Sequence, residues 1–290
     1  MHTDVVEIHG REFERLTQRI SEVTRQRSGR GIMVLGAAGV GKSHILARLS
    51  RWTHDPSPPR AITIFLHNLL VAPQRLPRYM LTSTIGALTN GRGAYEDCKL
   101  SQLWELAVRS AAGLAPEAKI THENAERAMK ALIDSHHPFE KSIQSVLLRV
   151  GLNLHHAVEE EGRFNSDVVD AGLDWLSGEQ LEPEQAESLH KPQPPSLRDD
   201  QDVERVFKVL AGMAQRCGMP FVLCVDQFDN LSEAQVAATT RFMQVLIDMY
   251  PTWSASSLAF RTTYSRSPKR RSSRWRTGIA SRRNESSSAW

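Results

Sequence analysis

The segment GAAGVGKS at Gly36–Ser43 constrains this 290-residue chain more than any other feature. It matches the pattern G-x-x-x-x-G-K-[ST] in full. It also follows the apolar run Ile32–Leu35 and precedes an apolar pattern of helical spacing that begins at Ile45. A phosphate-binding loop needs this context, because its glycines let backbone N–H groups face phosphate oxygens and the helix N-terminus adds positive potential. The segment therefore predicts a strand, a phosphate-binding loop and a helix in succession.

We expect this loop and the first turn of the helix to bind nucleotide phosphates. The Lys42 ammonium should reach the β- and γ-phosphates, and the Ser43 hydroxyl should ligate Mg²⁺. The alternative is a glycine-rich turn that binds no ligand. The predicted nucleotide-binding residues are Gly36, Ala37, Ala38, Gly39, Val40, Gly41, Lys42, Ser43 and His44.

A second motif supplies a carboxylate at the end of an apolar strand, which is the Walker B pattern. Asp226 follows the run FVLCV at 221–225, and we assign it to Mg²⁺ through a water. Gln227 comes next and can orient an attacking water, although it is a poor base. Asp229 is the nearest carboxylate that could act as the base, so the predicted catalytic residues are Lys42, Gln227 and Asp229. Two alternatives stay open, in which Asp226 caps a turn and Asp229 is an exposed turn residue.

The order of apolar patterns predicts an α/β fold with a parallel sheet, because strands alternate with helices. The predicted strands are 32–35, 61–66 and 219–225. The predicted helices are 11–26, the helix after the phosphate-binding loop to about residue 52, 76–90, 100–112, 122–135, 139–160, 166–177, a short helix opened by Glu182-Pro183, 199–217 and 232–250. Asn165 and Gly178 should begin and end the helix at 166–177, and Ser232 with Gln235 should form a capping box.

The distance between the two motifs predicts four parts. Ser43 and Asp226 are separated by 183 positions, far more than a nucleotide-binding core needs. We therefore divide the chain into an N-terminal helix with the P-loop half of the core (1–68), a helical insertion (69–198), the Walker B half of the core (199–250) and a Ser/Arg-rich tail (251–290). The insertion is the place where a protein partner of unknown identity would bind.

The basic charge of the chain is confined to the tail. Residues 251–290 carry nine basic residues and one acidic residue, a net charge of +8, which leaves −5 on residues 1–250 within an overall charge of +3. Such a segment buries too little apolar surface to order itself, so we expect disorder. Three interpretations stay open: an arm that binds nucleic acid weakly and non-specifically, a solvated tail without function, and out-of-frame sequence in a truncated product.

Membrane, secreted and fibrous classes are excluded by composition. No apolar run approaches the roughly 18 residues of a membrane span. The N-terminus lacks a basic-then-apolar signal segment, and the three cysteines lie far apart without metal-ligand or disulfide spacing. The paired histidines at 136–137 and 155–156 likewise lack the spacing of a metal site. We expect a cytoplasmic protein with no membrane contact.

The motifs together resemble the AAA+ and STAND branches of P-loop ATPases. GAAGVGKS with FVLCVDQFDNL carries the resemblance, which covers about residues 6–66 and 203–250. IHGREFERL at Ile8–Leu16 is similar to a box that precedes the P-loop in STAND and origin-recognition-type ATPases, where it packs near the adenine. VDQFDNL is similar to the VDQFEEL of a bacterial STAND group, with Asp229 at the first Glu of that pair and Asn230 at the second.

This resemblance implies a Mg²⁺-dependent ATPase that couples ATP and ADP states to conformational change or assembly, as an oligomer, in a bacterial regulatory system. Gly172–Leu181 is similar to a stretch in ATPases of phage-defence operons, which implies a defence role. A GTPase is disfavoured because no N/T-K-x-D motif occurs. The alternative is a nucleotide-gated switch or scaffold with negligible hydrolysis, because Gln227 is a poor base and no helical lid follows residue 250. Only 257–263 could form the sensor strand that such an ATPase should have, and its pattern is poor.

Overall fold

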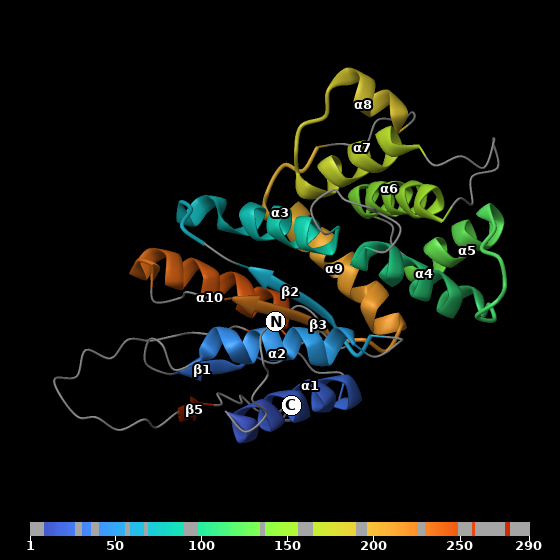
Figure 1. Ribbon diagram of the computed structural model, residues 1–290. Helices are drawn as coiled ribbons and strands as arrows, with labels where there is room; N and C mark the ends of the chain where they lie inside the picture. Colours follow the sequence, from blue (N-terminus) through green and yellow to red (C-terminus); the bar gives the residue numbers. More distant parts are fainter. Residues whose placement is uncertain are drawn as a thin grey trace, which may run out of the picture.

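The computed structural model describes residues 9–26, 31–35, 41–55, 59–66, 69–89, 98–133, 137–155, 165–189, 196–225, 230–248, 257–258 and 276–278 (Figure 1). The helices are α1 (Gly10–Gln26), α2 (Lys42–His54), α3 (Leu76–Leu88), α4 (Lys99–Ala112), α5 (His122–Leu132), α6 (Pro138–Leu154), α7 (Ser166–Ser177), α8 (Pro183–Ser188), α9 (Asp200–Arg216) and α10 (Glu233–Asp248), with the 3-10 helix η1 (Pro73–Arg75). The strands are β1 (Met33–Leu35), β2 (Ile62–Leu66), β3 (Phe221–Val225), β4 (Ser257–Leu258) and β5 (Arg276–Gly278).

A three-stranded sheet in the order β2-β3-β4 forms the centre, and all of its pairs are parallel. The expected parallel sheet is thus confirmed for β2 and β3, the two of these strands that the sequence predicts. The P-loop strand differs from the expectation, because β1 forms a separate antiparallel pair with β5. A strand of three residues offers few ladder hydrogen bonds, so its pairing is decided by the segment that runs beside it rather than by its own sequence.

Alternate side chains of β3 pack on opposite faces of the sheet. Val222 and Cys224 join the cluster formed by the apolar faces of α1 and α2. Phe221, Leu223 and Val225 join the larger cluster formed with α3 to α7, α9 and α10. Because strand side chains alternate with period two, this continuous apolar strand is covered on both faces, as a parallel sheet requires.

The described residues between β2 and α9 form helices and no strand, as the sequence predicts. Local signals set their ends. The Asn165 side chain accepts hydrogen bonds from the Asp167 and Val168 N–H groups at the start of α7. Gly178 ends the same helix in the left-handed region, with φ 84°. The division of the chain into four parts stays a prediction.

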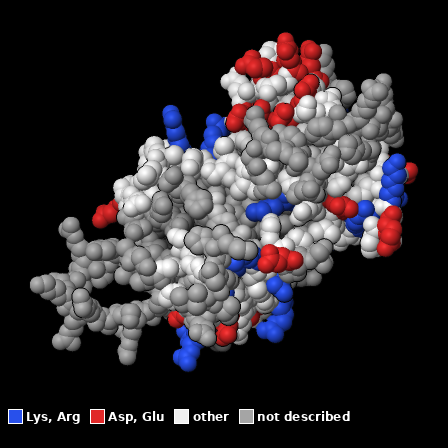
Figure 2. All heavy atoms as spheres, in the orientation of Figure 1, with Lys and Arg blue, Asp and Glu red and all other residues white. Residues whose placement is uncertain are grey.

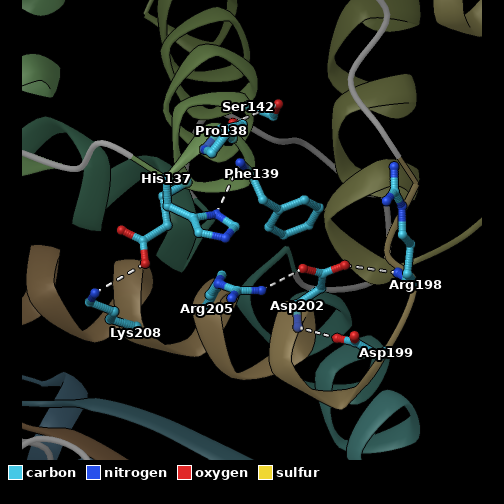
Figure 3. Close-up of polar contacts among 10 residues, drawn as sticks. His137, Pro138, Phe139, Ser142, Arg198, Asp199, Asp202, Arg205 and Lys208 are labelled. Atoms are coloured by element: carbon cyan, nitrogen blue, oxygen red, sulfur yellow. Dashed lines mark hydrogen bonds and ion pairs between the residues drawn. The ribbon is translucent and has the colours of Figure 1, made fainter.

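α9 connects this helical block to the central sheet. Glu140 of α6 is almost fully buried and accepts a hydrogen bond from the Lys208 ammonium of α9 at 3.0 Å (Figure 3). Asp202 of α9 accepts from Arg205 at 2.8 Å and from the Arg198 N–H at 3.0 Å. After Arg216 the chain turns and enters β3. α9 therefore contacts the helical block and leads, through a short turn, into the strand before Asp226.

The tail departs from the expected disorder at five residues. Ser257–Leu258 pairs with β3, and Arg276–Gly278 pairs with β1. The backbones of β1 and β3 offer hydrogen-bond groups at their edges, and such edges attract any extended segment whatever its side chains. The remainder of 251–290 lies outside the described residues. None of the described helices combines the length and apolarity that a membrane span requires.

Candidate functional site

The N-terminus of α2 has features that favour an anion. Gly41 precedes it in the left-handed conformation, with φ 91°, and the Ile45 N–H makes the first helical hydrogen bond to its carbonyl at 3.1 Å. A glycine has no side chain to cap the first N–H groups, and the first turn holds no acidic residue. Helix N-termini of this kind carry partial positive charge and bind phosphate.

α2 runs antiparallel to the strands, so this N-terminus lies toward their carboxyl ends. Thr53, near the end of α2, accepts a hydrogen bond at 2.9 Å from Thr63, near the start of β2. Figure 1 shows the same relation, with the arrowheads of β2 and β3 pointing toward the side on which α2 begins. In open α/β sheets ligands bind beyond the carboxyl ends of the strands.

β3 ends at the same edge, immediately before the predicted metal ligand. Its five residues are all buried, and its last residue, Val225, is paired in register with Leu66, the last residue of β2. Asp226 is the next residue along the chain. The strand that carries the Walker B pattern therefore delivers the chain to the edge at which α2 begins.

The structure describes only part of the predicted site. Ser43 is exposed and His44 is half-buried, and both lie in the first turn of α2 with Gly41 before them. Gly36–Val40 and 226–229 lie outside the described residues, and the side chain of Lys42 is not described. The roles assigned to those residues remain predictions.

His9 is a neighbour of the loop that the sequence motifs did not single out. It has a positive φ of 58°, rare for a residue other than glycine, and its Nε2 would lie 3.4 Å from a Cβ placed on Gly41. α1, which follows it, is held on α2 by Arg48, whose guanidinium lies 4.2 Å from the centre of the Phe13 ring. The similarity of Ile8–Leu16 to the box before the P-loop was the only sequence signal for this contact.

Gln235 was predicted only as half of a capping box. The box is present, since the Ser232 N–H donates to its Oε1 and its own N–H reaches the Ser232 hydroxyl. Its Nε2 also donates to the carbonyls of Leu69 and Val71, in the segment that follows β2. These long-range bonds tie together two segments at the carboxyl edge, and no local pattern could have indicated them.

Two further ionisable side chains, Lys99 and His54, lie away from this edge. Lys99 of α4 donates to the Thr63 carbonyl at 3.0 Å, and burial lowers its pKa. Burial, followed by the nearby Lys99 charge, lowers the pKa of His54 at the end of α2. Lys99 thus pairs a backbone carbonyl of β2 instead of joining the site.

Two of the paired histidines have structural partners. His137 caps α6 by accepting from the Phe139 N–H, and His155 stacks on Trp104 with ring centres 5.2 Å apart. In the described part of the chain, no three His, Cys, Asp or Glu side chains gather as a metal site. A magnesium site made by Ser43, Asp226 and phosphate oxygens needs no such cluster.

A family model described as "AAA ATPase domain" matches residues 8–251. The matched span contains the GAAGVGKS motif, the helical block and the Walker B pattern, which is most of the chain. Comparison with curated proteins and with solved structures gave no match.

Proposed function

Since this chain belongs to the family of AAA ATPase domains, we propose that it binds ATP with Mg²⁺ at the carboxyl edge of the sheet and hydrolyses it. One observation carries the proposal. α2 begins at an uncapped glycine on the edge at which β2 and β3 end, so the helix that follows the predicted phosphate-binding loop and the strand that precedes Asp226 meet at one edge.

The nucleotide phosphates would bind at the start of α2. The backbone N–H groups of Gly36–Ser43 would surround the phosphate oxygens, and the Lys42 ammonium would donate to the β- and γ-phosphates. Gly41 fits this role, because its left-handed backbone and missing Cβ allow a close approach beside His9.

Mg²⁺ would be held by the Ser43 hydroxyl and, through a water, by Asp226. When bound, the ion neutralises charge on the phosphates and orients them. Ser43 suits this role because it is exposed in the first turn of α2, and Asp226 suits it because it follows directly on the buried end of β3.

Hydrolysis would depend on the residues that follow Asp226. Gln227 would orient the attacking water through its amide, and Asp229 would accept the proton from that water. Attack on the γ-phosphorus breaks the bond to the β-phosphate oxygen and releases ADP and phosphate.

The helical block would couple the nucleotide state to a partner or to assembly. α9 contacts the block and then enters β3, so a change at the end of β3 has a direct mechanical route to α4 and α6. A bacterial regulatory or defence system would use this coupling, and the partner would be a protein that binds the block.

A nucleotide-gated switch with negligible turnover is the second candidate, and the glutamine at 227 favours it. Titration with a fluorescent ATP analogue, with ATP, ADP and GTP as competitors, measures binding. Phosphate release after mixing with ATP and Mg²⁺ measures turnover. Binding that ATP competes away, with release that EDTA abolishes, supports the ATPase. Binding without release supports the switch, and absence of binding refutes both.

A further inference from the structure

The side chain of Gln235 makes four hydrogen bonds at the edge of the sheet. Its Oε1 accepts from the Ser232 N–H and from the Ser232 hydroxyl, each at 2.9 Å. Its Nε2 donates to the Val71 carbonyl at 2.9 Å and to the Leu69 carbonyl at 3.4 Å. The amide has two acceptor positions on Oε1 and two donor hydrogens on Nε2, and all four are used.

The two bonds from Nε2 do more than a helix cap requires. The capping box at the start of α10 is complete with Oε1 alone, whereas Leu69 and Val71 lie more than 160 positions away in sequence. Leu69 is fully buried, and half-buried Val71, Leu231 and Val236 pack against the same core. Both bonds are partly buried, so loss of the donor costs free energy, because water can replace it only in part.

The clasp, meaning the bonds from Gln235 to the carbonyls of Leu69 and Val71, joins the two segments that leave the carboxyl edge. β2 and β3 end in register at Leu66 and Val225, and α10 packs on both η1 and α3. The segment 226–229 follows directly on Val225, the buried last residue of β3. It is followed within three positions by Ser232, whose N–H donates to Oε1 of the same Gln235 amide.

We infer that Gln235 is a positioning residue for the proposed ATPase: by fixing the segment after β3 to the segment after β2, it sets the end point of the segment that carries Asp226, Gln227 and Asp229. The inference deepens the proposed function and rests on it. Gln235 itself acts through these residues and holds no substrate atom.

The test compares three variants. Gln235→Glu keeps an acceptor for Ser232 but replaces the donor to Leu69 and Val71 with a second oxygen. Gln235→Met removes the clasp without adding charge. Ser232→Ala is the matched control, because it weakens the capping box and leaves the clasp in place. Thermal unfolding confirms that each variant folds.

Hydrogen exchange of backbone amides is the first measurement, and it needs no nucleotide. We expect peptides that cover 226–232 to exchange at least about tenfold faster in both Gln235 variants than in the wild type or in Ser232→Ala, because two partly buried hydrogen bonds are lost. Equal exchange in folded Gln235 variants and in the wild type would overturn the inference.

Steady-state phosphate release is the second measurement. Both Gln235 variants should lower kcat at least about tenfold while KM for ATP stays within about threefold, and Ser232→Ala should leave both values near the wild type. An unchanged kcat, or an equal loss in Ser232→Ala, contradicts the inference. If the wild type releases no phosphate, the proposed hydrolysis is refuted, and the exchange result alone decides whether the clasp positions the segment.

Discussion

At the scale of single residues, the proposed site depends most on the charge of Lys42 at the N-terminus of α2. Lys42→Ala removes a charge-assisted contact to phosphate, worth about 1.5–3 kcal/mol, so ATP affinity should fall about tenfold to a hundredfold. Arg51→Ala is the control, because it removes a positive charge from the opposite end of the same helix. Isothermal titration measures both affinities. Unchanged affinity in folded Lys42→Ala would refute the P-loop assignment.

The two carboxylates after β3 should respond differently to substitution. Asp226→Asn should weaken Mg²⁺-dependent nucleotide binding, because it removes the charge assigned to the ion. Asp229→Asn should preserve binding and abolish phosphate release, because it removes the proposed base. Titration with and without Mg²⁺ and a phosphate-release assay separate the two. Equal turnover in the wild type and in Asp229→Asn would remove Asp229 from the mechanism.

Substitution of two helical glycines by alanine should change the stability of the protein in opposite directions. A Cβ on Gly151 of α6 would overlap the ring of buried Trp104, whereas a Cβ on Gly212 of α9 would meet no atom within 4 Å. Gly151→Ala should therefore destabilise the protein by about 1–3 kcal/mol, and Gly212→Ala should stabilise it by about 0.5–1 kcal/mol. Urea unfolding measures both changes, and the opposite order would mean that α4 and α6 do not pack as described.

At the scale of elements, the second turn of α9 carries Glu204, whose charged form is disfavoured in the folded protein. Burial, followed by the charge of Asp200 one turn earlier, raises the pKa of Glu204. The folded state therefore holds this proton more tightly than the unfolded state, and the contribution to stability falls as pH rises through the raised pKa. Glu204→Gln should raise Tm at pH 7, and the gain should vanish below the ordinary pKa of 4.5.

Glu126 of α5 provides the control of opposite sign. Its hydrogen bond to Lys130 lowers its pKa, so its contribution is present above pH 4.5 and is lost as pH falls through the lowered value. Glu126→Gln should slightly lower Tm at pH 7 and leave it unchanged in acid. Both effects are small because both side chains contact solvent. Thermal unfolding from pH 3 to pH 8 checks the pair, and parallel curves for the two variants would contradict it.

The elements also show which features a sequence can predict. Asn165 and Gly178 at the ends of α7, and the Ser232–Gln235 box, were predicted correctly, because each depends on residues within a few positions. The contacts of His9 with Gly41, and of Lys99 with Thr63, were not predicted. They depend on tertiary packing between segments tens of residues apart, and nothing in a helical or strand period encodes them.

The same reasoning explains the strands. β2 and β3 were predicted because continuous apolar runs are typical of strands buried on both faces. β4 lies within 257–263, the only tail segment that the sequence offered as a strand, whereas β5 was not predicted. Both lie in a sequence rich in serine and arginine and pair with the edges that β3 and β1 present. The site residues are predicted from motifs alone, whereas the clasp of Gln235 is evident only from the folded arrangement of two segments.

At the scale of the whole molecule, charge is separated along the chain. Residues 165–189, which include α7 and α8, hold seven acidic residues and no lysine or arginine. Figure 2 shows acidic side chains gathered over α8. The tail holds +8. We therefore expect any attraction for nucleic acid to come from the tail, because residues 1–250 carry a net charge of −5.

The last prediction separates the charge of the tail from its strands. One variant replaces seven basic residues outside β4 and β5 with glutamine and keeps both strands; the seven are Arg266, Lys269, Arg270, Arg271, Arg274, Arg282 and Arg283. The other variant deletes 251–290 and so removes both charge and strands. We expect non-specific binding of DNA by the wild type to fall steeply with salt, because bound counterions are released, and to be lost in both variants.

Stability and ATP affinity should distinguish these two variants. The glutamine variant keeps β4 beside Leu223 and Cys224, so its Tm and ATP affinity should match the wild type. The deletion exposes the edge of β3 two residues before Asp226 and removes the partner of β1, so both quantities should fall. Fluorescence anisotropy with labelled DNA, thermal unfolding and nucleotide titration give the three results. A deletion that keeps the wild-type Tm would show that β4 and β5 contribute nothing to the core, whereas DNA binding by the glutamine variant at physiological salt would place the basic surface elsewhere in the molecule.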